Sequence, residues 1–281
     1  MDLKFTNRIF RNTLAALALT LCVTAAPLAS LAEGQPTSAQ PPAAQTVADE
    51  SAPAEPGWDV QIIPVIWAPS TNMNLSYGDR TVGTTITPAD LEGKFQFGGT
   101  GQVLARKGKW GLSAEGFYVN LAEDVSFRSV TGSMRVTQTI AQGTGQYRIK
   151  EGNVPVDLVF GARYYNFNMD TSFTSDPRLF TFDYHDTRKL SWVDPLIGAQ
   201  TSFPLSDVFR FNLYGDLGGF GVGSDLSWRA SGIFGWSIND SIDLLAGYSA
   251  LGAKHRKGSG FDTVSFDFSM YGPVLGASFK L

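Results

Sequence analysis

The sequence has one cysteine and two histidines, and this scarcity excludes several kinds of site. The cysteine, Cys22, lies in a segment that we expect to be removed, so the mature chain has no thiol for a disulfide or a thiolate metal site. There is no His or Cys cluster with metal-ligand spacing, no phosphate-binding glycine loop and no haem motif. We therefore expect no cofactor and no bound metal.

Strong charge is absent as well. The chain has 22 Lys and Arg residues against 26 Asp and Glu residues, and no basic stripe with interleaved aromatic residues occurs in it. Nucleic acid is therefore not an expected partner.

A third absence is an apolar run long enough for a membrane-spanning helix. The run at 14–24 is well short of the roughly 20 residues that a helical span needs. It follows three basic residues, Lys4, Arg8 and Arg11. We predict a signal peptide over 1–32, cleaved after Ala32, because small residues occupy the two recognised positions before the cut. A lipoprotein signal that uses Cys22 is the alternative, but the bulky Leu21 before it argues against lipidation.

The next segment, 33–57, is rich in Pro, Ala, Gln and Ser and has almost no large apolar side chains. This composition predicts a disordered periplasmic linker. Docking to a cell-wall or assembly partner is the alternative, because the segment is acidic and rich in proline. Loss of 1–32 removes one acidic and three basic residues, so the formal net charge changes from −4 to −6.

From residue 58 to 281, segments of ten or more residues alternate apolar and polar side chains and are separated by turns. In a bilayer every backbone polar group needs a partner within the protein, so only helices and closed barrels span it. Strands of such barrels alternate lipid-facing and lumen-facing residues. We predict an all-β fold, a transmembrane antiparallel up-and-down β-barrel in the outer membrane of a Gram-negative-type envelope. A soluble β-sandwich also alternates, but it does not readily explain the signal, the strand lengths and the loop lengths together.

We expect about ten strands, with eight or twelve as alternatives, and an even number places both termini on the periplasmic side. Short connections fall at every second junction, and longer polar ones, expected to face outward, occupy 70–94, 123–133, 170–188 and 254–262. Within the first of these, 73–86 suggests an added hairpin projecting beyond the membrane. The expected strands are 58–69, 95–106, 109–122, 134–149, 155–169, 189–203, 208–221, 224–238, 241–253 and 263–280.

Aromatic residues near strand ends are candidates for the two interfacial girdles of such a barrel. They are Trp58, Trp110, Tyr118, Tyr164, Trp228, Trp236 and Tyr248. The last strand is irregular, because Phe266, Phe268 and Met270 have one parity whereas Tyr271 and the following apolar residues have the other. We expect a β-bulge at Gly272-Pro273 to reconcile them.

Five strings resemble a widespread family of bacterial outer-membrane β-barrel proteins: ARKGKWG (105–111), GARYYNFN (161–168), WVDPLIGAQ (192–200), YGDLGGFGVGSDLSW (214–228) and YGPVLGASFKL (271–281). The resemblance covers nearly everything after Gly57. It implies a barrel exported through the periplasm, and no catalytic activity is established for the family. The C-terminus also resembles the insertion signal read by the barrel-assembly machinery, through Gly276, Phe279 and Leu281, although Leu281 stands where Phe is commonest.

Four inward-facing charges are the main site candidates. Counting back from turns places Asp216 opposite Arg229, Asp194 near Asp216, and Arg163 on the next strand. We expect a lumenal network, which satisfies polar groups in a narrow barrel because buried charges need partners. A selectivity constriction for a small solute is the functional alternative. Ten strands should leave little or no pore.

The two histidines, His185 and His255, fall in stretches expected on the outer side, where a surface hydrolase would act. Neither has a nucleophile placed by a recognisable motif. A basic cluster around the second, Lys254, His255, Arg256 and Lys257, is a candidate contact for lipopolysaccharide phosphates. A merely solvated loop explains the cluster equally well.

We therefore predict a non-enzymatic outer-membrane barrel, either structural or a narrow porin-like channel for small solutes. The alternative function is a lipid or peptide hydrolase that uses an outer histidine. The expected partners are outer-membrane lipid and lipopolysaccharide, and the sequence does not indicate an oligomeric state.

Overall fold

The computed structural model describes residues 57–77, 80–91, 95–127, 130–175, 183–257 and 264–281. The predicted signal peptide and all but the last residue of the predicted linker lie outside these ranges. In the described ranges, no helix is long and apolar enough to cross a membrane.

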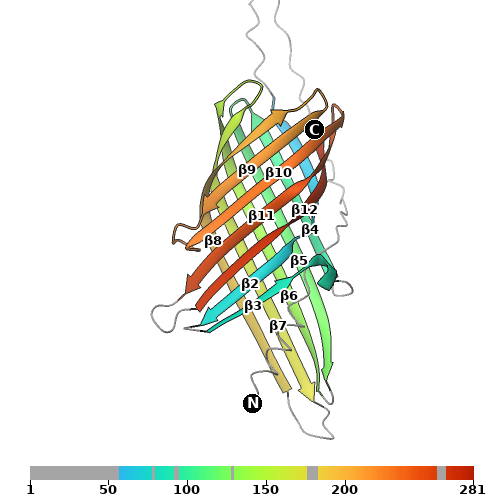
Figure 1. Cartoon of the computed structure of the whole chain (residues 1–281), viewed down its shortest axis with the longest axis vertical. Coiled ribbons are helices and arrows are strands. Elements are labelled where there is room, and N and C mark those ends of the chain that lie inside the picture. The colour runs from blue at the N-terminus through green and yellow to red at the C-terminus, as the bar shows by residue number, and fades with distance from the viewer. Residues whose placement is uncertain (1–56, 78–79, 92–94, 128–129, 176–182, 258–263) are drawn as a thin grey trace, which may run out of the picture.

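Ten strands form a closed antiparallel barrel (Figure 1), which confirms the predicted fold class and strand number. The barrel closes where β1 (Asp59–Trp67) pairs with β12 (Val264–Lys280). β1 also pairs with β4, and from β4 to β12 each strand pairs with the next one along the chain. The intervening strands are β4 (Phe95–Lys107), β5 (Trp110–Phe127), β6 (Val130–Lys150), β7 (Val156–Ser175), β8 (Asp183–Pro204), β9 (Phe209–Gly218), β10 (Leu226–Asn239) and β11 (Ile242–Lys257).

The expected hairpin is present as β2 (Ser70–Tyr77) and β3 (Arg80–Ile86), followed by the short 3-10 helix η1 (Pro88–Leu91). β2 pairs with β12 from Ser70↔Tyr271 to Tyr77↔Val264, so the hairpin continues the barrel wall beyond the end of β1. Its neighbour in the wall is therefore the outer half of β12. Its projection beyond the membrane stays a prediction.

The prediction of two long outer loops was wrong over most of their length. The stretches expected at 123–133 and 170–188 are largely strand, and β5 to β8 extend far beyond the other strands at one end (Figure 1). In these extensions many of the side chains are polar, and the strands continue to pair beyond the apolar band of the barrel exterior. For example, the hydroxyls of Ser133 and Ser172 are 3.0 Å apart across β6 and β7.

The β-bulge expected in the last strand is absent. β12 pairs with β11 without a register shift from Val264 to Phe279. Phe268 and Met270 are buried, whereas Tyr271 and Leu275 are exposed on the outer face. The change of parity therefore reflects an apolar interior in the outer half of the barrel, not a kink in the strand.

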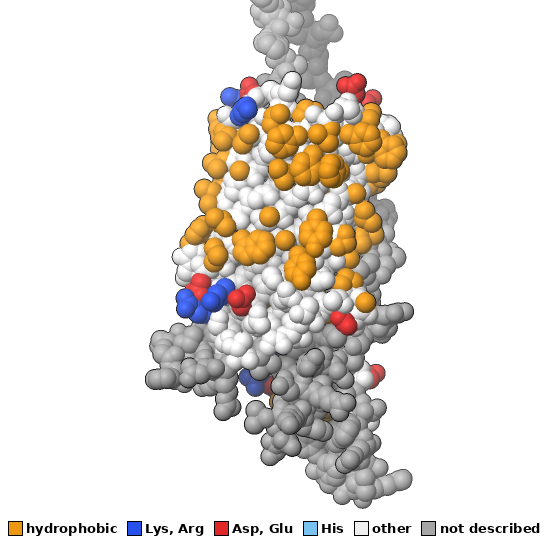
Figure 2. All heavy atoms as spheres, viewed as in Figure 1, with side chains coloured by type: hydrophobic (Ala, Val, Ile, Leu, Met, Phe, Trp, Pro, Cys, Tyr) orange, Lys and Arg blue, Asp and Glu red, His pale blue; other side chains and the backbone are white. Residues whose placement is uncertain are grey.

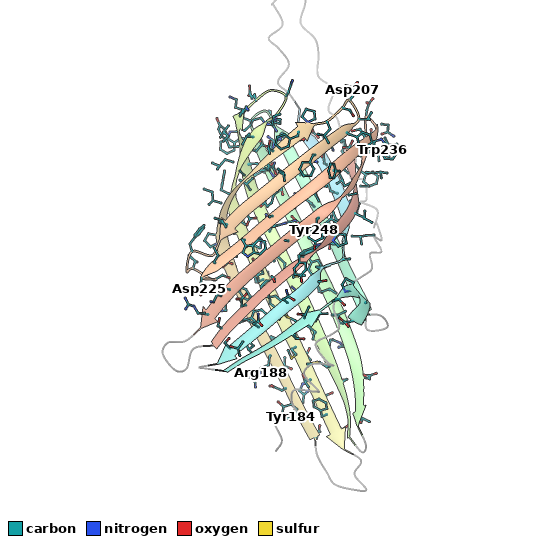
Figure 3. The ribbon with its side chains drawn as sticks, in the orientation of Figure 1. Tyr184, Arg188, Asp207, Asp225, Trp236 and Tyr248 are labelled. Atoms are coloured by element: carbon teal, nitrogen blue, oxygen red, sulfur yellow. The ribbon has the colours of Figure 1, made fainter. Side chains whose placement is uncertain are left out.

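Apolar side chains are exposed on every strand of the barrel, and on the face shown in Figure 2 they gather in bands across it. Among the expected girdle aromatics, Trp58, Trp110, Tyr164, Trp236 and Tyr248 are exposed, while Tyr118 and Trp228 are half-buried. Figure 3 places Trp236 close to the end that carries the short turns. Such an exterior suits lipid on all sides, and the short-turn end is the one that faces the periplasm in barrels of this class.

Candidate functional site

The centre of the barrel interior holds a buried ion pair between two of the four predicted charges. Arg163 on β7 donates from Nη2 to Oδ2 of Asp216 on β9 at 2.5 Å, and from Nε to the amide oxygen of Gln142 at 2.7 Å. The hydroxyl of Tyr214 donates to the same carboxylate oxygen at 2.6 Å. Both charges are thus paired and hydrogen-bonded, as groups shielded from water need to be.

The third predicted charge, Arg229, has a different partner from the expected one. It lies opposite Asp216 in the β9–β10 register, as the sequence indicated. Its Nη1, however, donates to Glu115 on β5 at 2.5 Å. β5 and β10 are five positions apart in a ten-strand barrel, so this bond spans the interior. Sequence reasoning missed Glu115, although its parity on 109–122 places it inside.

Asp194, the fourth predicted charge, does not join the ion pairs. It faces Arg163 in register but accepts a hydrogen bond at 2.6 Å from the backbone N–H of Ser224, in the β9–β10 turn. Its Oδ2 atom has no hydrogen-bond partner among the described residues. Three of the four predicted charges stay connected, because Arg229 also lies 5.5 Å from the ring centroid of Tyr214, which bonds Asp216, and only Asp194 lies outside the network. Ser224 and Asp194 are both fully buried, so the turn supplies the hydrogen bond that this carboxylate needs in the interior.

An apolar cluster fills the interior on the outer side of these charges. Trp192 stacks on Tyr165 with ring centroids 4.8 Å apart, and Phe268 meets Tyr165 edge-on at 5.6 Å. The side chains come from β3, β5 to β8, β11 and β12, so they converge from most of the wall. The buried members are Ile86, Phe117, Val119, Leu121, Ile140, Tyr165, Trp192, Leu251, Ala253, Phe268 and Met270, and we call this set the aromatic plug.

His255 belongs to the interior and not to the outer rim. Its ring stacks on Trp192 at 4.5 Å, and its Nδ1 is 2.6 Å from the carbonyl oxygen of Gly223. Asp194 and Ser224 lie in the same region, but the Ser224 hydroxyl accepts from the Trp192 indole at 2.7 Å. The Ser224 hydroxyl, His255 and Asp194 therefore do not form the hydroxyl–imidazole–carboxylate chain of a hydrolytic triad, because only the backbone N–H of Ser224 bonds to Asp194.

His185 is exposed and far from this cluster. It lies seven residues from Trp192 along β8, or about 23 Å in an extended strand, and pairs in register with Ser172. The structure therefore does not bring the two histidines together. In the described part of the chain, no group of three or more His, Cys, Asp or Glu residues could hold a metal ion.

The basic cluster at the outer rim is divided by strand alternation. Lys254 and Arg256 are exposed, whereas His255 points inward, so including it in a lipopolysaccharide contact was wrong. Arg256 pairs with Asp225, which Figure 3 labels at this rim, and Lys254 faces Asp267 in register. The side chain of Lys257 lies outside the described side chains. Opposite charges therefore alternate at this rim, as Figure 2 shows.

A second set of charges, which sequence reasoning missed, lies near the short-turn end. The carboxylate of Asp157 forms ion pairs with Arg106 at 2.5 Å and with Arg148 at 2.8 Å, and it accepts a hydrogen bond from Gln200 at 3.1 Å. Across the interior, Asp243 meets two cations in the same way, Arg210 at 2.5 Å and Lys280 at 3.2 Å. Each buried carboxylate thus faces two cations. The sequence could have indicated these residues, because each occupies a strand position whose side chain is expected to face the interior.

The predicted insertion signal occupies the end of β12 and the residue after it. Phe279 and Leu281 are exposed on the outer face, while Gly276 lies against β1. A Cβ atom at Gly276 would come within 2.7 Å of the Pro64 carbonyl oxygen. The structure gives this glycine a packing reason, and recognition by the assembly machinery stays a prediction.

No protein-family model matches the chain, and no curated protein matches it either. Among solved structures, the chain is similar to the outer membrane protease OmpT of Escherichia coli, with a TM-score of 0.51 and 10% identity over 83% of this chain and 99% of that one. Two others overlap too loosely to carry an argument. The attachment invasion locus protein Ail of Yersinia pestis, in complex with the heparin analogue sucrose octasulfate, has a TM-score of 0.33 and 12% identity over 80% of this chain and 99% of that one. Neisserial surface protein A has a TM-score of 0.25 and 13% identity over 81% and 99%.

The closed barrel, its lipid-type exterior and the fold it shares with OmpT identify this chain as an outer-membrane β-barrel protein. The resemblance noted in the sequence is supported at that level. At 10% identity, the likeness to OmpT is one of fold alone.

Proposed function

We propose that this protein is a non-enzymatic barrel with a closed interior, and that its role in the outer membrane is structural. The observation that carries the proposal is the aromatic plug. A conducting pore needs a polar path that water can fill from end to end, whereas close-packed apolar side chains, aromatic and aliphatic, leave ions no hydration. Eight strands leave an interior just filled by side chains, and ten leave little more.

The two ion pairs below the plug support the same proposal. Arg163 with Asp216, and Arg229 with Glu115, neutralise one another and hold long side chains across the interior. A selectivity constriction would instead present charges of one sign to a passing solute. We therefore favour the structural alternative over the porin-like channel.

Surface hydrolysis is less well supported. His255 is bonded to a backbone carbonyl, and Ser224 is fully buried and bonded to Trp192. A hydrolase needs its nucleophile and base in contact with each other and within reach of the substrate. His185 is exposed and faces Ser172 in register, but the Ser172 hydroxyl bonds to that of Ser133.

Efflux of a small labelled solute from proteoliposomes tests the proposal. The refolded protein should release the solute no faster than lipid vesicles alone. The matched comparison is a double variant, Trp192→Ala and Phe268→Ala together, which lacks two side chains of the aromatic plug. Rapid efflux through the unchanged protein would contradict the closed interior, and cleavage of lipid or peptide that is lost on His255→Ala would favour the hydrolase.

A further inference from the structure

An open pocket of about 310 Å³, lined by both polar and apolar side chains, lies at the short-turn end of the barrel, on the side of β8 to β10. Its wall combines the turn before β7, the turn between β8 and β9, and the ends of β8 to β10. The lining residues are Asn153, Pro155, Ser202, Pro204, Ser206, Asp207, Val208, Phe209, Arg210 and Ser237. Figure 3 labels Asp207 at this end, away from the aromatic plug.

Arg210 is the strongest hydrogen-bond donor in the cavity wall. Its Nη2 bonds Asp243 at 2.5 Å, and the side chain keeps 29% of its surface exposed. A guanidinium carries five N–H donors in a planar fork that fits the two oxygens of a carboxylate or a phosphate. One engaged nitrogen therefore leaves donors for a ligand in the cavity.

The charge around Arg210 is not balanced by its carboxylate. Asp243 is shared with Lys280 and also accepts a hydrogen bond at 2.6 Å from the Ser237 hydroxyl. On the opposite side of the same end, Asp157 is shared by Arg106 and Arg148. Four cations thus face two buried carboxylates. Exposed carboxylates at the rim, Asp59, Glu151, Asp207 and Asp240, offset this excess, so the surplus of cations is confined to the buried layer around Arg210.

Neutral donors complete the cavity. Ser202 contributes a hydroxyl and Asn153 a carboxamide, and Asp207 is the one acidic residue among the lining residues. A cationic fork beside neutral donors is the composition that binds small oxyanions.

We propose that this cavity is a binding site for an oxyanion, a carboxylate or phosphate group held by Arg210. This inference does not depend on the closed interior. The site lies on the side that we assign to the periplasm, and the plug lies toward the other end.

Two sources offer the same chemistry. One is a free anion. The other is the chain's own segment 33–57, which contains Glu33, Asp49, Glu50 and Glu55 and no Lys or Arg, and which leads into β1 at the end where the cavity lies. Twenty-five extended residues reach about 80 Å, far more than the width of the barrel.

Titration of the refolded protein, residues 33–281 in detergent, with inorganic phosphate tests the proposal by calorimetry at constant ionic strength. We expect saturable binding that weakens on the order of tenfold in Arg210→Gln, since a charge-assisted bidentate contact is lost. Asp207→Asn removes a repelling carboxylate and should bind more tightly. Arg188→Gln, on the exposed outer part of β8, should bind like the unchanged protein.

Asn153→Ala is a second test in an exposed turn, where folding is not at stake, and it should weaken binding severalfold. Deletion of 33–57 distinguishes the sources. Tighter phosphate binding after deletion means that the linker carboxylates compete for the site, and unchanged binding means that the site takes free anions. No saturable binding in either form, or full affinity in both Arg210→Gln and Asn153→Ala, would overturn the proposal.

Discussion

Arg163 and Asp216 form an ion pair at 2.5 Å in which the two side chains are 1% and 0% exposed. They project from β7 and β9 and meet over β8, with Gln142 and Tyr214 hydrogen-bonded to the pair. The pair is one of two charge bridges beneath the aromatic plug. The loss of unfolding free energy when this pair is broken therefore measures how much buried charge contributes to the stability of the barrel.

Asp216→Ala should lower the free energy of unfolding by about 3–5 kcal/mol, because it leaves Arg163 buried without its charge partner. Urea unfolding of the refolded protein in lipid measures this loss. The sequence pattern alone would attribute the loss to Arg229, but Arg229 keeps Glu115 in the structure.

The exposed pair of Asp186 and Arg188 on β8 is the matched control. The hydrogen bond from Arg188 holds the pKa of Asp186 below its ordinary value, yet solvent screens both groups. Asp186→Ala should therefore hardly change the unfolding curve. Equal losses in the two variants would refute the assignment of a special role to the buried pair.

Charge on the lipid face should be far more damaging than charge in the interior. Phe234 is exposed on the outer face of β10, and its neighbour Ser231 faces inward. Phe234→Arg should cost about 2–4 kcal/mol if it lies near the bilayer midplane, and less toward the interfaces. Ser231→Arg should be milder. Folding yield into vesicles compares them, and the same contrast applies to Leu213→Arg and Asn212→Arg.

Gly223 in the β9–β10 turn should not tolerate a side chain. A Cβ atom there would lie 2.4 Å from the Val193 carbonyl oxygen and 2.6 Å from Oδ1 of Asp194. Gly223→Ala should destabilise the barrel by about 1–3 kcal/mol through overpacking. Gly116 on β5 has nothing within 4 Å of its Cβ position, so Gly116→Ala should be neutral or slightly stabilising. Thermal unfolding on heated and unheated gels ranks the two.

Substitution of the two histidines should change the free energy of unfolding by different amounts. His255→Ala loses the stack on Trp192 and the bond to Gly223, at a cost of about 1–3 kcal/mol. His185→Ala, on an exposed face, should stay within about 0.5 kcal/mol of the unchanged protein. If His185→Ala were the more damaging substitution, our assignment of the exposed and packed histidines would be wrong.

Strand positions and faces were predictable because a barrel wall imposes a strict two-residue period. The segments expected at 95–106 and 208–221 differ from β4 and β9 by three residues or fewer at each end. The same period placed Asp216 opposite Arg229. Local alternation was sufficient for these predictions.

Contacts across the interior were not predictable from that period. Parity says that Glu115 faces inward, but which arginine reaches it depends on the shape of the whole barrel. Asp194 bonds the backbone N–H of Ser224 in the β9–β10 turn, a contact that the alternation of side chains does not encode. The aromatic plug was missed because apolar residues of inward parity, such as Phe268, look like an irregular strand when a polar interior is assumed.

Single-channel recording of the refolded protein in a planar bilayer tests the closed interior most directly. We predict that the unchanged protein gives no stable open level above the lipid baseline, and that Asp216→Ala is destabilised but equally silent. A reproducible ohmic conductance of the unchanged protein, or a stably folded Asp216→Ala variant with altered ion selectivity, would contradict the account and identify the charges as the lining of a pore.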